Sequence, residues 1–483
     1  MEKNQENQEN HEIKITRTNK GKEQVILNSK YKFNLSNKRK DNTKKFKCTE
    51  YKTMNKCPSF IILNDKNEVL EYNGSHNHLE KRSDATKSLV KGEIKDRIDK
   101  SSDPYNENLK RAFDEICKKI GGIPPDYTTI KSQLSNYKRK KLPDDIKTFD
   151  EIPDESIYFK TENDENFMIF KNDDLLIFQS PFQAKLFSKY KDVFADGTFD
   201  SAPKPCYQIF ITRTYVKKIN GYYTTSFSLL RNKTQTAYET LLEEIKKNSN
   251  KYNNGIEASP KIFHCDFERA ISNAVINIFP NANIKYCVFH YKNTLEKQLI
   301  KLCGNNILNN ADICTHFNDI MNLPFINPEY IYDIYNKIKN ECQEKRYDQF
   351  LEFLDYFKKN YLISYETNYW NYYDNIEHIT NNASESYNKY LNNLFQNKKP
   401  NFFQLLLQLQ KEEYKSFNDY DNRMKGNWGK IKQRKLIRTD EIKALVNYYK
   451  NMEILLGKKG SDRNDFVNLW LDCLRDLKIK IIN

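Results

Sequence analysis

Short hydrophobic runs alternate with polar turns in the first part of the chain, over residues 25–78. The runs "VILNSKYKFNL", "KKFKC", "SFIILN" and "EVLEYNG" are rich in β-branched and aromatic residues, which predicts β-strands. Over residues 83–142 the spacing becomes helical, as in "LKRAFDEICKKI". The segment before these patterns is rich in Asn, Glu and Lys, a composition typical of disorder. The sequence therefore predicts a disordered tail at 1–24, a small β-rich domain at 25–80 and a helical region at 83–150.

A second pattern, in which strand-like and helix-like segments alternate, starts near Ile157. "DVFADGT", "YQIFITRTYV" and "YYTTSFSLL" predict three strands, and "KKING" joins the last two as a hairpin. "TQTAYETLLEEIKKN" predicts a helix, "KIFHCD" a strand, "FERAISNAVINIF" a helix and "IKYCVFH" a strand. We therefore predict a multidomain chain with an α/β core at 157–395, a helical insertion at about 291–375 and a helical C-terminal region at 396–483.

Composition and charge narrow the class of protein. No run approaches the ~20 apolar residues that span a bilayer, and the polar N-terminus lacks the apolar core of a signal peptide, so we expect an intracellular protein without a membrane partner. Ten scattered cysteines in 483 residues favour reduced thiols over a disulfide framework. The formal net charge is +14, and residues 1–150 carry 33 Lys and Arg against 23 Asp and Glu. This excess fits a polyanion-binding front end and equally a lysine-rich soluble surface.

Two cysteines and two histidines in the β-rich region have metal-ligand spacing. Cys48 is followed by eight residues, Cys57 by eighteen, and His76 and His78 flank one Asn. Two thiolates and two imidazoles make a closed tetrahedral zinc set, and two histidines at spacing two point to one face of a strand. The alternative is a pair of buried cysteines with incidental histidines. A small module with little core gains more from a structural metal, so we expect zinc.

This stretch, about residues 25–80, resembles a FLYWCH-type zinc finger. The resemblance rests on an aromatic-rich β module, an aromatic residue two positions before the first Cys and the terminal His-x-His; Tyr31, Phe33 and Phe46 stand in the aromatic places. Phe46 occupies a position where the family usually has Trp. The resemblance implies structural zinc and binding of DNA or protein.

Three acidic residues stand at critical places of the α/β pattern. The strand order β-β-β-α-β-α-β resembles a ribonuclease-H-like sheet, in which the first and fourth strands are neighbours. Asp196 interrupts or ends the first strand, Asp266 ends the fourth, and Glu385 lies near the start of the helix in "TNNASESYNKYL". Taken singly, Asp196 is typical of a turn, Asp266 of a helix N-cap, and Glu385 of an acidic residue in the first turn of a helix, where the helix dipole favours negative charge. Taken together, they could hold divalent cations.

On this helix, Tyr387, Tyr390, Leu391 and Leu394 follow one another at helical spacing, and we expect this stripe to face the sheet. Glu385 lies off the stripe and would reach the site from the end of the helix.

Residues from about 190 to 395 resemble the transposase domain of Mutator-like elements, a DDE-type transposase. "FADGTFDSAP" matches the first-acid motif, "FHCDFERAISNAVINIFPNANIKYCVFHYKNTLEKQL" the longest motif, and "TNNASESYNKYL" the last motif. The resemblance implies Asp196, Asp266 and Glu385 as catalytic residues that bind magnesium or manganese. Asp200 is expected outside the metal pocket.

Cys287 and His290 form a Cys-x-x-His pair that the family also carries. Two ligands do not close a zinc site, although Cys314 and His316 could complete one. The alternative is a structural role, with a buried thiol and a hydrogen-bonded histidine at a strand end.

The segment "IKSQLSNYKRKKLP" gathers cations that could neutralise phosphates without reading sequence; they are Lys131, Lys138, Arg139, Lys140 and Lys141. The alternative is a solvated helix end. The combined resemblance implies a nuclear protein, compatible with a homo-oligomer, that binds double-stranded DNA, cuts strands at element ends and transfers them. The alternatives are a domesticated DNA-binding regulator without transposition and a nuclease without strand transfer.

Overall fold

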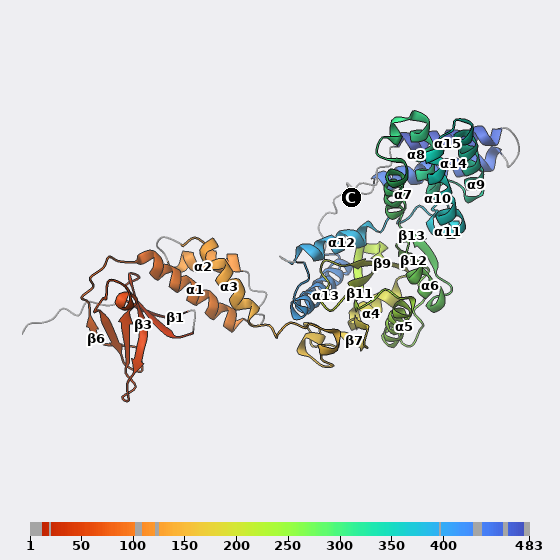
Figure 1. Cartoon of the computed structure of the whole chain (residues 1–483). Helices are drawn as coiled ribbons and strands as arrows, with labels where there is room; N and C mark the ends of the chain where they lie inside the picture. The colour runs from red at the N-terminus through yellow and green to blue at the C-terminus, as the bar shows by residue number, and fades with distance from the viewer. Residues whose placement is uncertain are drawn as a thin grey trace, which may run out of the picture. The chain divides into compact units, whose positions relative to one another are not determined.

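The computed structural model describes residues 12–18, 21–101, 109–120, 125–395, 398–427, 437–456 and 462–477. Its contacts divide the chain into two compact units, Met1–Asp144 and Asp145–Asn483. Figure 1 shows the helices and strands of both units. Each unit has hydrophobic clusters of its own.

The first unit opens with a six-stranded antiparallel sheet whose strands follow one another in chain order. They are β1 (Ile13–Arg17), β2 (Glu23–Leu27), β3 (Tyr31–Lys38), β4 (Lys44–Cys48), β5 (Phe60–Leu63) and β6 (Val69–Asn73). Asn28 and Ser29 both have positive φ and form the turn between β2 and β3, in which the N–H of Lys30 donates to the carbonyl of Leu27 at 3.0 Å. Phe33, Phe46 and Ile61 are fully buried at the centre of this module.

Strand β1 corrects the expectation of a disordered segment over residues 1–24, because part of that segment is ordered. It pairs with β2 from Ile13 to Arg17, which satisfies its backbone hydrogen bonds. It also packs against the first helix, where a Cβ on Gly92 would meet the Thr16 hydroxyl. The short strand carries too few apolar residues for its order to be visible in composition.

Three helices complete the first unit: α1 (Arg82–Lys100), α2 (Leu109–Ile120) and α3 (Thr128–Arg139). Their buried faces meet in one small cluster that includes Ile94, Phe113 and Leu134. The helical spacing predicted for this region is present.

The second unit is built on a seven-stranded mixed sheet of order β13-β12-β9-β10-β11-β8-β7. The strands are β7 (Met168–Lys171), β8 (Leu175–Phe178), β9 (Asp192–Thr198), β10 (Gln208–Val216), β11 (Gly221–Leu230), β12 (Ile262–Cys265) and β13 (Asn283–Tyr286). The predicted order β-β-β-α-β-α-β is confirmed from β9 to β13. The expected strand "IKYCVFH" ends at Tyr286, because Val288 already begins a helix.

The sheet has one apolar face and one face with polar residues. Val193 and Ala195 of β9 and Phe263 of β12 join the apolar cluster with α5 (Gln235–Lys251) and α6 (Arg269–Ile278). The alternate residues face the other way, where α12 (Asn382–Asn393) packs on β9. Two further helices, α4 (Pro181–Lys189) and α13 (Phe402–Met424), pack together through Phe182 and Phe417.

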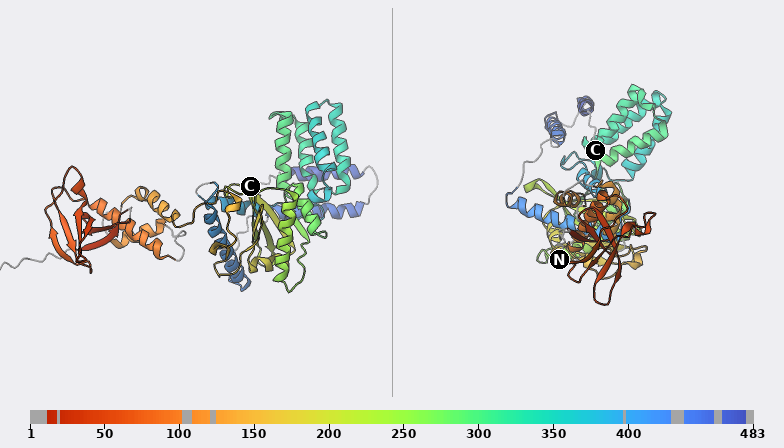
Figure 2. Two further views of the ribbon diagram at one scale, coloured as in Figure 1. Left: turned by 60° about the horizontal axis from the view of Figure 1, so that its bottom comes forward. Right: turned by 90° about the vertical axis from the view of Figure 1, so that its left-hand side faces the viewer.

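Between β13 and α12 the chain forms a helical layer that rises from one end of the sheet (Figure 2). It contains α7 (Val288–Cys303), α8 (Ala311–Asn322), α9 (Ile331–Glu344), α10 (Asp348–Phe357) and α11 (Thr367–Trp370). Helices α14 (Ile437–Leu456) and α15 (Asp462–Asp476) share its apolar core, in which Trp370 and Trp470 are fully buried. Among the described helices, none has the length and apolar character needed to cross a membrane.

Candidate metal centres

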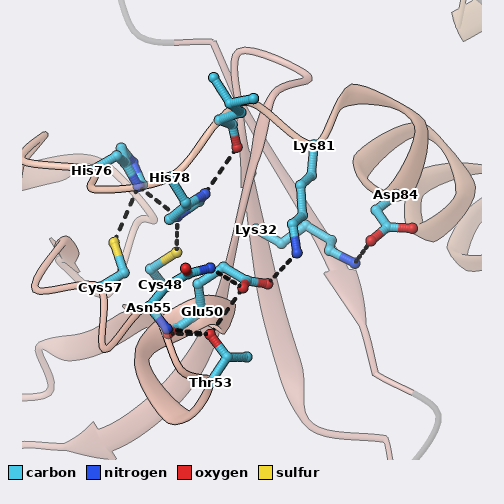
Figure 3. A network of polar contacts seen from close by, with 11 residues as sticks. Lys32, Cys48, Glu50, Thr53, Asn55, Cys57, His76, His78, Lys81 and Asp84 are labelled. Atoms are coloured by element: carbon cyan, nitrogen blue, oxygen red, sulfur yellow. Dashed lines mark hydrogen bonds and ion pairs between the residues drawn. The ribbon is translucent and has the colours of Figure 1, made fainter.

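The two cysteines and two histidines of the first unit converge on one point (Figure 3). Their ligand atoms all lie within 4.8 Å of one another. Cys48 Sγ lies 3.3 Å from His78 Nε2, Cys57 Sγ lies 3.4 Å from His76 Nδ1, and the two ring nitrogens are 3.3 Å apart. Cys48 ends β4, Cys57 lies in the connection between β4 and β5, and the histidines follow β6, so the cluster ties the end of the sheet together.

Contacts outside the cluster fix the orientation of both rings. The outer nitrogen of His76 lies 3.1 Å from the Ser59 hydroxyl, and His78 Nδ1 lies 2.9 Å from the carbonyl of Leu79. Metal binding through the inner nitrogens leaves the outer N–H groups to donate to these oxygens, the usual support of metal-bound histidines. Tyr31 stacks on His76 with ring centroids 3.7 Å apart.

Glu50 organises the loop between the two cysteines. Its backbone carbonyl accepts from Cys57 N–H at 3.2 Å, and its carboxylate pairs with Lys81 at 2.8 Å (Figure 3). Thr53 and Asn55 donate to the same carboxylate. The Lys81 hydrogen bond is the largest cause that lowers the pKa of Glu50, to about 2. The loop is therefore held closed around Cys57.

The donor set fits zinc. Burial raises the pKa of the Cys48 thiol to about 12, so a thiolate there requires a cation beside it. Burial and then the charge of His78 lower the pKa of His76 to about 4, which keeps the imidazole in its neutral, metal-binding form. Four protein donors leave no open position, so the site is structural in type.

In the second unit, Asp196 lies in strand β9 and Asp266 directly follows the neighbouring strand β12. Strand β12 runs parallel to β9 with Ile262 opposite Asp192 and His264 opposite Phe194. Extension of the same register by two residues would set Asp266 opposite Asp196, on the face of β9 that α12 covers. The ladder stops before that point, which leaves the two carboxylates at the end of the pairing.

The pair Asp196-Gly197 lies inside strand β9 and does not form a turn. Gly197 pairs with Phe210 of β10, and a Cβ there would lie 2.5 Å from the Gln208 side chain. Asp196 is 9% exposed. Asp200 is exposed and pairs with Lys398 at 3.0 Å, away from the cluster.

Helix α12 carries Glu385 in its first turn and corrects the expected apolar stripe. The buried positions are Ser384, Asn388 and Leu391, whereas Tyr390 and Leu394 are among the exposed residues. The inward face of this helix is polar at Ser384 and Asn388, where Asn388 contacts Asp196, and only Leu391 of the expected stripe is fully buried. Glu385 belongs to the half-buried edge of that face.

Cys287 and His290 lie in the same site as the acids. His290 Nδ1 lies 2.9 Å from Asp266 Oδ1 and 3.6 Å from Glu385 Oε1, and Cys287 Sγ lies 3.7 Å from the same Glu385 oxygen. Cys314 and His316 belong to no metal-sized donor group among the described residues, and His316 instead faces Glu341 at 3.5 Å. They therefore do not complete a site with Cys287 and His290.

The electrostatics of this site fit a divalent cation. Burial and then the charge of Asp266 raise the pKa of Asp196 to about 8, and burial raises the pKa of Glu385. Burial opposes protonation of His290, but its contacts with Asp266 and Cys287 raise the His290 pKa to about 11. Asp266 Oδ1 and His290 Nδ1 are buried without a hydrogen bond of good geometry. Carboxylates that resist ionisation together are stabilised by a bound cation.

Three further residues, which the sequence analysis missed, organise this site. Asn388 Nδ2 donates to Asp196 Oδ2 at 2.8 Å, and Asn381 Nδ2 donates to the carbonyl of Ala195 at 3.0 Å. Arg213 of β10 is buried and donates to the carbonyl of Ala383 at 2.5 Å. The positions of Asn381, Glu385 and Asn388, four and three residues apart, were the available signal, because such spacing places them on one helix face.

The basic residues at the end of α3 do not form one free patch. Lys131 and Lys140 are exposed, and Lys141 pairs with Asp99 at 2.6 Å. Lys138 is half-buried, and the Arg139 side chain lies outside the described part of the chain. Among the side chains of this surface that the structure describes, Lys131 and Lys140 are exposed without an ion pair, Lys141 is paired and Lys138 is half-buried.

The first unit contains a Cys₂His₂ cluster of the zinc-finger type. The second unit is an α/β domain in which acidic side chains lie close to one another. Residues 15–78 match the FLYWCH zinc finger domain and residues 193–294 match the MULE transposase domain. The chain therefore combines a MULE transposase domain with an N-terminal FLYWCH zinc finger, as its motifs indicate. No curated protein matches the chain.

Proposed function

We propose that the chain is a DNA transposase whose second unit cuts and joins DNA strands with divalent metal ions held by Asp196, Asp266 and Glu385. The parallel pairing of β12 with β9, which reaches His264 and Phe194, two residues before Asp266 and Asp196, is the observation that supports this proposal. The order β11-β10-β9-β12-β13 supports assignment of the core to the ribonuclease-H-like class. Glu385 lies outside the residues matched by the transposase model, so its role rests on its place beside His290.

Magnesium or manganese, when bound, would polarise a phosphate and activate the attacking water or 3′-hydroxyl. The protein side chains orient the carboxylates for that task. Asn388 fixes one oxygen of Asp196, and the backbone N–H of Gly197 donates to the other at 2.8 Å. Arg213 fixes the first turn of α12 through Ala383, which sets the position of Glu385.

The first unit would bind the DNA. Its zinc finger and exposed lysines offer positive charge for the phosphate backbone, and double-stranded DNA in the nucleus is the partner and location that this function requires. The alternative remains a domesticated regulator, which would bind DNA through the same unit without cutting it.

Nicking of a supercoiled plasmid that carries the element ends flanking the gene tests the proposal. We expect nicks and joined products with magnesium or manganese, loss of both in Asp266→Asn, and normal activity in the control Asp200→Asn, whose side chain is exposed and outside the cluster. DNA binding without nicks in the unaltered chain would favour the regulator. Nicks without joined products would favour a nuclease.

A further inference from the structure

The acidic site of the second unit contains donors that magnesium does not prefer. Cys287 Sγ, a ring nitrogen of His290 and a carboxylate oxygen of Glu385 all lie within 4.8 Å of one another. Glu385 is the one proposed catalytic acid in a described donor group of this size, and its partners there are a thiol and an imidazole. Sulfur and nitrogen donors favour zinc over magnesium.

The spacing of these donors agrees with tetrahedral zinc. Zinc bonds to nitrogen, oxygen and sulfur imply separations of about 3.3–3.8 Å between ligand atoms. Glu385 Oε1 lies 3.6 Å from His290 Nδ1 and 3.7 Å from Cys287 Sγ. In the zinc finger cluster of the first unit, the corresponding separations are 3.3 and 3.4 Å.

The backbone around Cys287 supports a bound thiolate. The N–H of Asn381 points at Cys287 Sγ over 3.2 Å, and N–H donors to sulfur stabilise negative charge there. Cys287 N–H donates to the carbonyl of Cys265 at 3.2 Å, which fixes the residue at the end of β13. The three donors therefore come from the start of α7 and the first turn of α12, both held to the sheet.

We propose that Cys287, His290 and Glu385 bind one zinc ion with an open fourth position. Asp266, 2.9 Å from His290, or a water molecule would complete the coordination. One thiolate and one carboxylate would balance the charge of the ion. This site is distinct from the zinc finger and brings the zinc content of the chain to two.

The second zinc would also regulate the reaction, and this consequence rests on the proposed function. The Glu385 carboxylate cannot be a ligand of this zinc ion and of a catalytic magnesium ion in the same arrangement at the same time. Zinc is therefore expected to inhibit nicking in competition with magnesium.

Zinc content of the full chain, measured after removal of excess metal, tests the proposal. We expect two equivalents in the unaltered chain and one in each of two different variants, Cys48→Ser/Cys57→Ser and Cys287→Ser. The control Cys206→Ser, a buried thiol in the second unit outside both donor groups, should retain two. One equivalent in the unaltered chain, or none in the double variant, would overturn the proposal.

Cobalt substitution distinguishes the removal of a zinc ligand from the loss of zinc through misfolding. In the Cys48→Ser/Cys57→Ser chain, bound cobalt should show a sulfur-to-metal absorption band that His290→Gln abolishes while circular dichroism stays unchanged. A cobalt spectrum without that band would count against Cys287 as a ligand. Two zinc equivalents, with no nicking even in an excess of magnesium that displaces the second zinc, would leave this inference standing and remove the proposed function. One equivalent with nicking would do the reverse.

Discussion

The amide of Asn388 donates to Asp196 Oδ2 over 2.8 Å, and both side chains are buried. This contact joins the centre of α12 to the middle of β9. It orients a carboxylate whose other oxygen already accepts from the backbone.

Replacement of Asn388 by Ala should weaken magnesium-dependent nicking. The lost donor leaves Asp196 free to rotate, and removal of such an outer contact typically lowers metal affinity about 10- to 100-fold. Magnesium titration of the nicking rate measures the change. The exposed neighbour Lys389, changed to Ala, should behave like the unaltered chain; equal magnesium dependence in both variants would contradict a role for Asn388.

Replacement of Arg213 by Lys should lower the nicking rate more than DNA affinity. Arg213 donates to the carbonyls of Ala383 and Tyr222 and lies 4.5 Å from the Tyr387 ring centroid. A lysine cannot make both contacts, and a small displacement of Glu385 costs about 100-fold in rate. Hydrogen exchange of α12 should rise in parallel. Arg231→Lys, an exposed control, should change neither quantity.

Stability of the second unit should depend on pH through Glu413. Burial raises its pKa to about 7, although the Ser180 hydroxyl donates to it at 2.6 Å. The folded state therefore holds a proton that the unfolded state releases near pH 4.5, and stability falls as pH rises from about 4.5 through 7. The loss is at most about 3 kcal/mol. Urea unfolding at pH 5 and 8 measures it, and Glu413→Gln, which keeps the acceptor, should remove that part of the pH dependence.

Loss of zinc should unfold the first unit. The cluster joins the loop after β4 to the segment after β6, and such a small core depends on the metal. Cys57→Ser should release one zinc and make this unit sensitive to protease, while Cys117→Ser, a half-buried thiol outside the cluster, should not. Resistance of the Cys57→Ser unit to protease would contradict this dependence.

Exposed lysines of α3 should contribute to DNA affinity without sequence preference. Lys131→Ala with Lys140→Ala should reduce the slope of log affinity against log salt by about 2, because each phosphate contact contributes about one unit. Asp99→Asn should act in the opposite direction, since it frees Lys141. Fluorescence anisotropy at several salt concentrations measures both, and Ser132→Ala serves as a neutral control. An unchanged slope would place the DNA elsewhere on the unit.

The sequence predicted the parts of the fold that rest on strong local patterns. "DVFADGT" is strand β9, and the helices on either side of β12 follow their periodicity. Strands β7 and β8, of four residues each, were not predicted from the sequence. The Cys₂His₂ spacing identified the zinc cluster because all four ligands are rare residue types close in sequence.

The acidic site could be predicted only in part. Position in the strand order correctly placed Asp196 and Asp266 on or just after neighbouring strands, but the prediction for the side of α12 that faces the sheet was wrong. Tyr387 and Tyr390 suggested an apolar inner face, whereas the inner face holds Ser384 and Asn388. Hydrophobic periodicity fails where a helix covers charged groups. The meeting of Cys287 with Glu385 depends on the path of five intervening helices, which no local pattern encodes.

Because helices α7–α11 lie between the sheet and α12 in the chain, the parts of the acidic site are synthesised at different times. Strands β9 and β12 leave the ribosome well before α12, with all of α7–α11 synthesised in between. A nascent chain therefore has Asp196 and Asp266 on an uncovered surface, without Glu385 or Asn388. Under the proposed function, competence for DNA cutting would arise only late in synthesis, long after the zinc finger has been made.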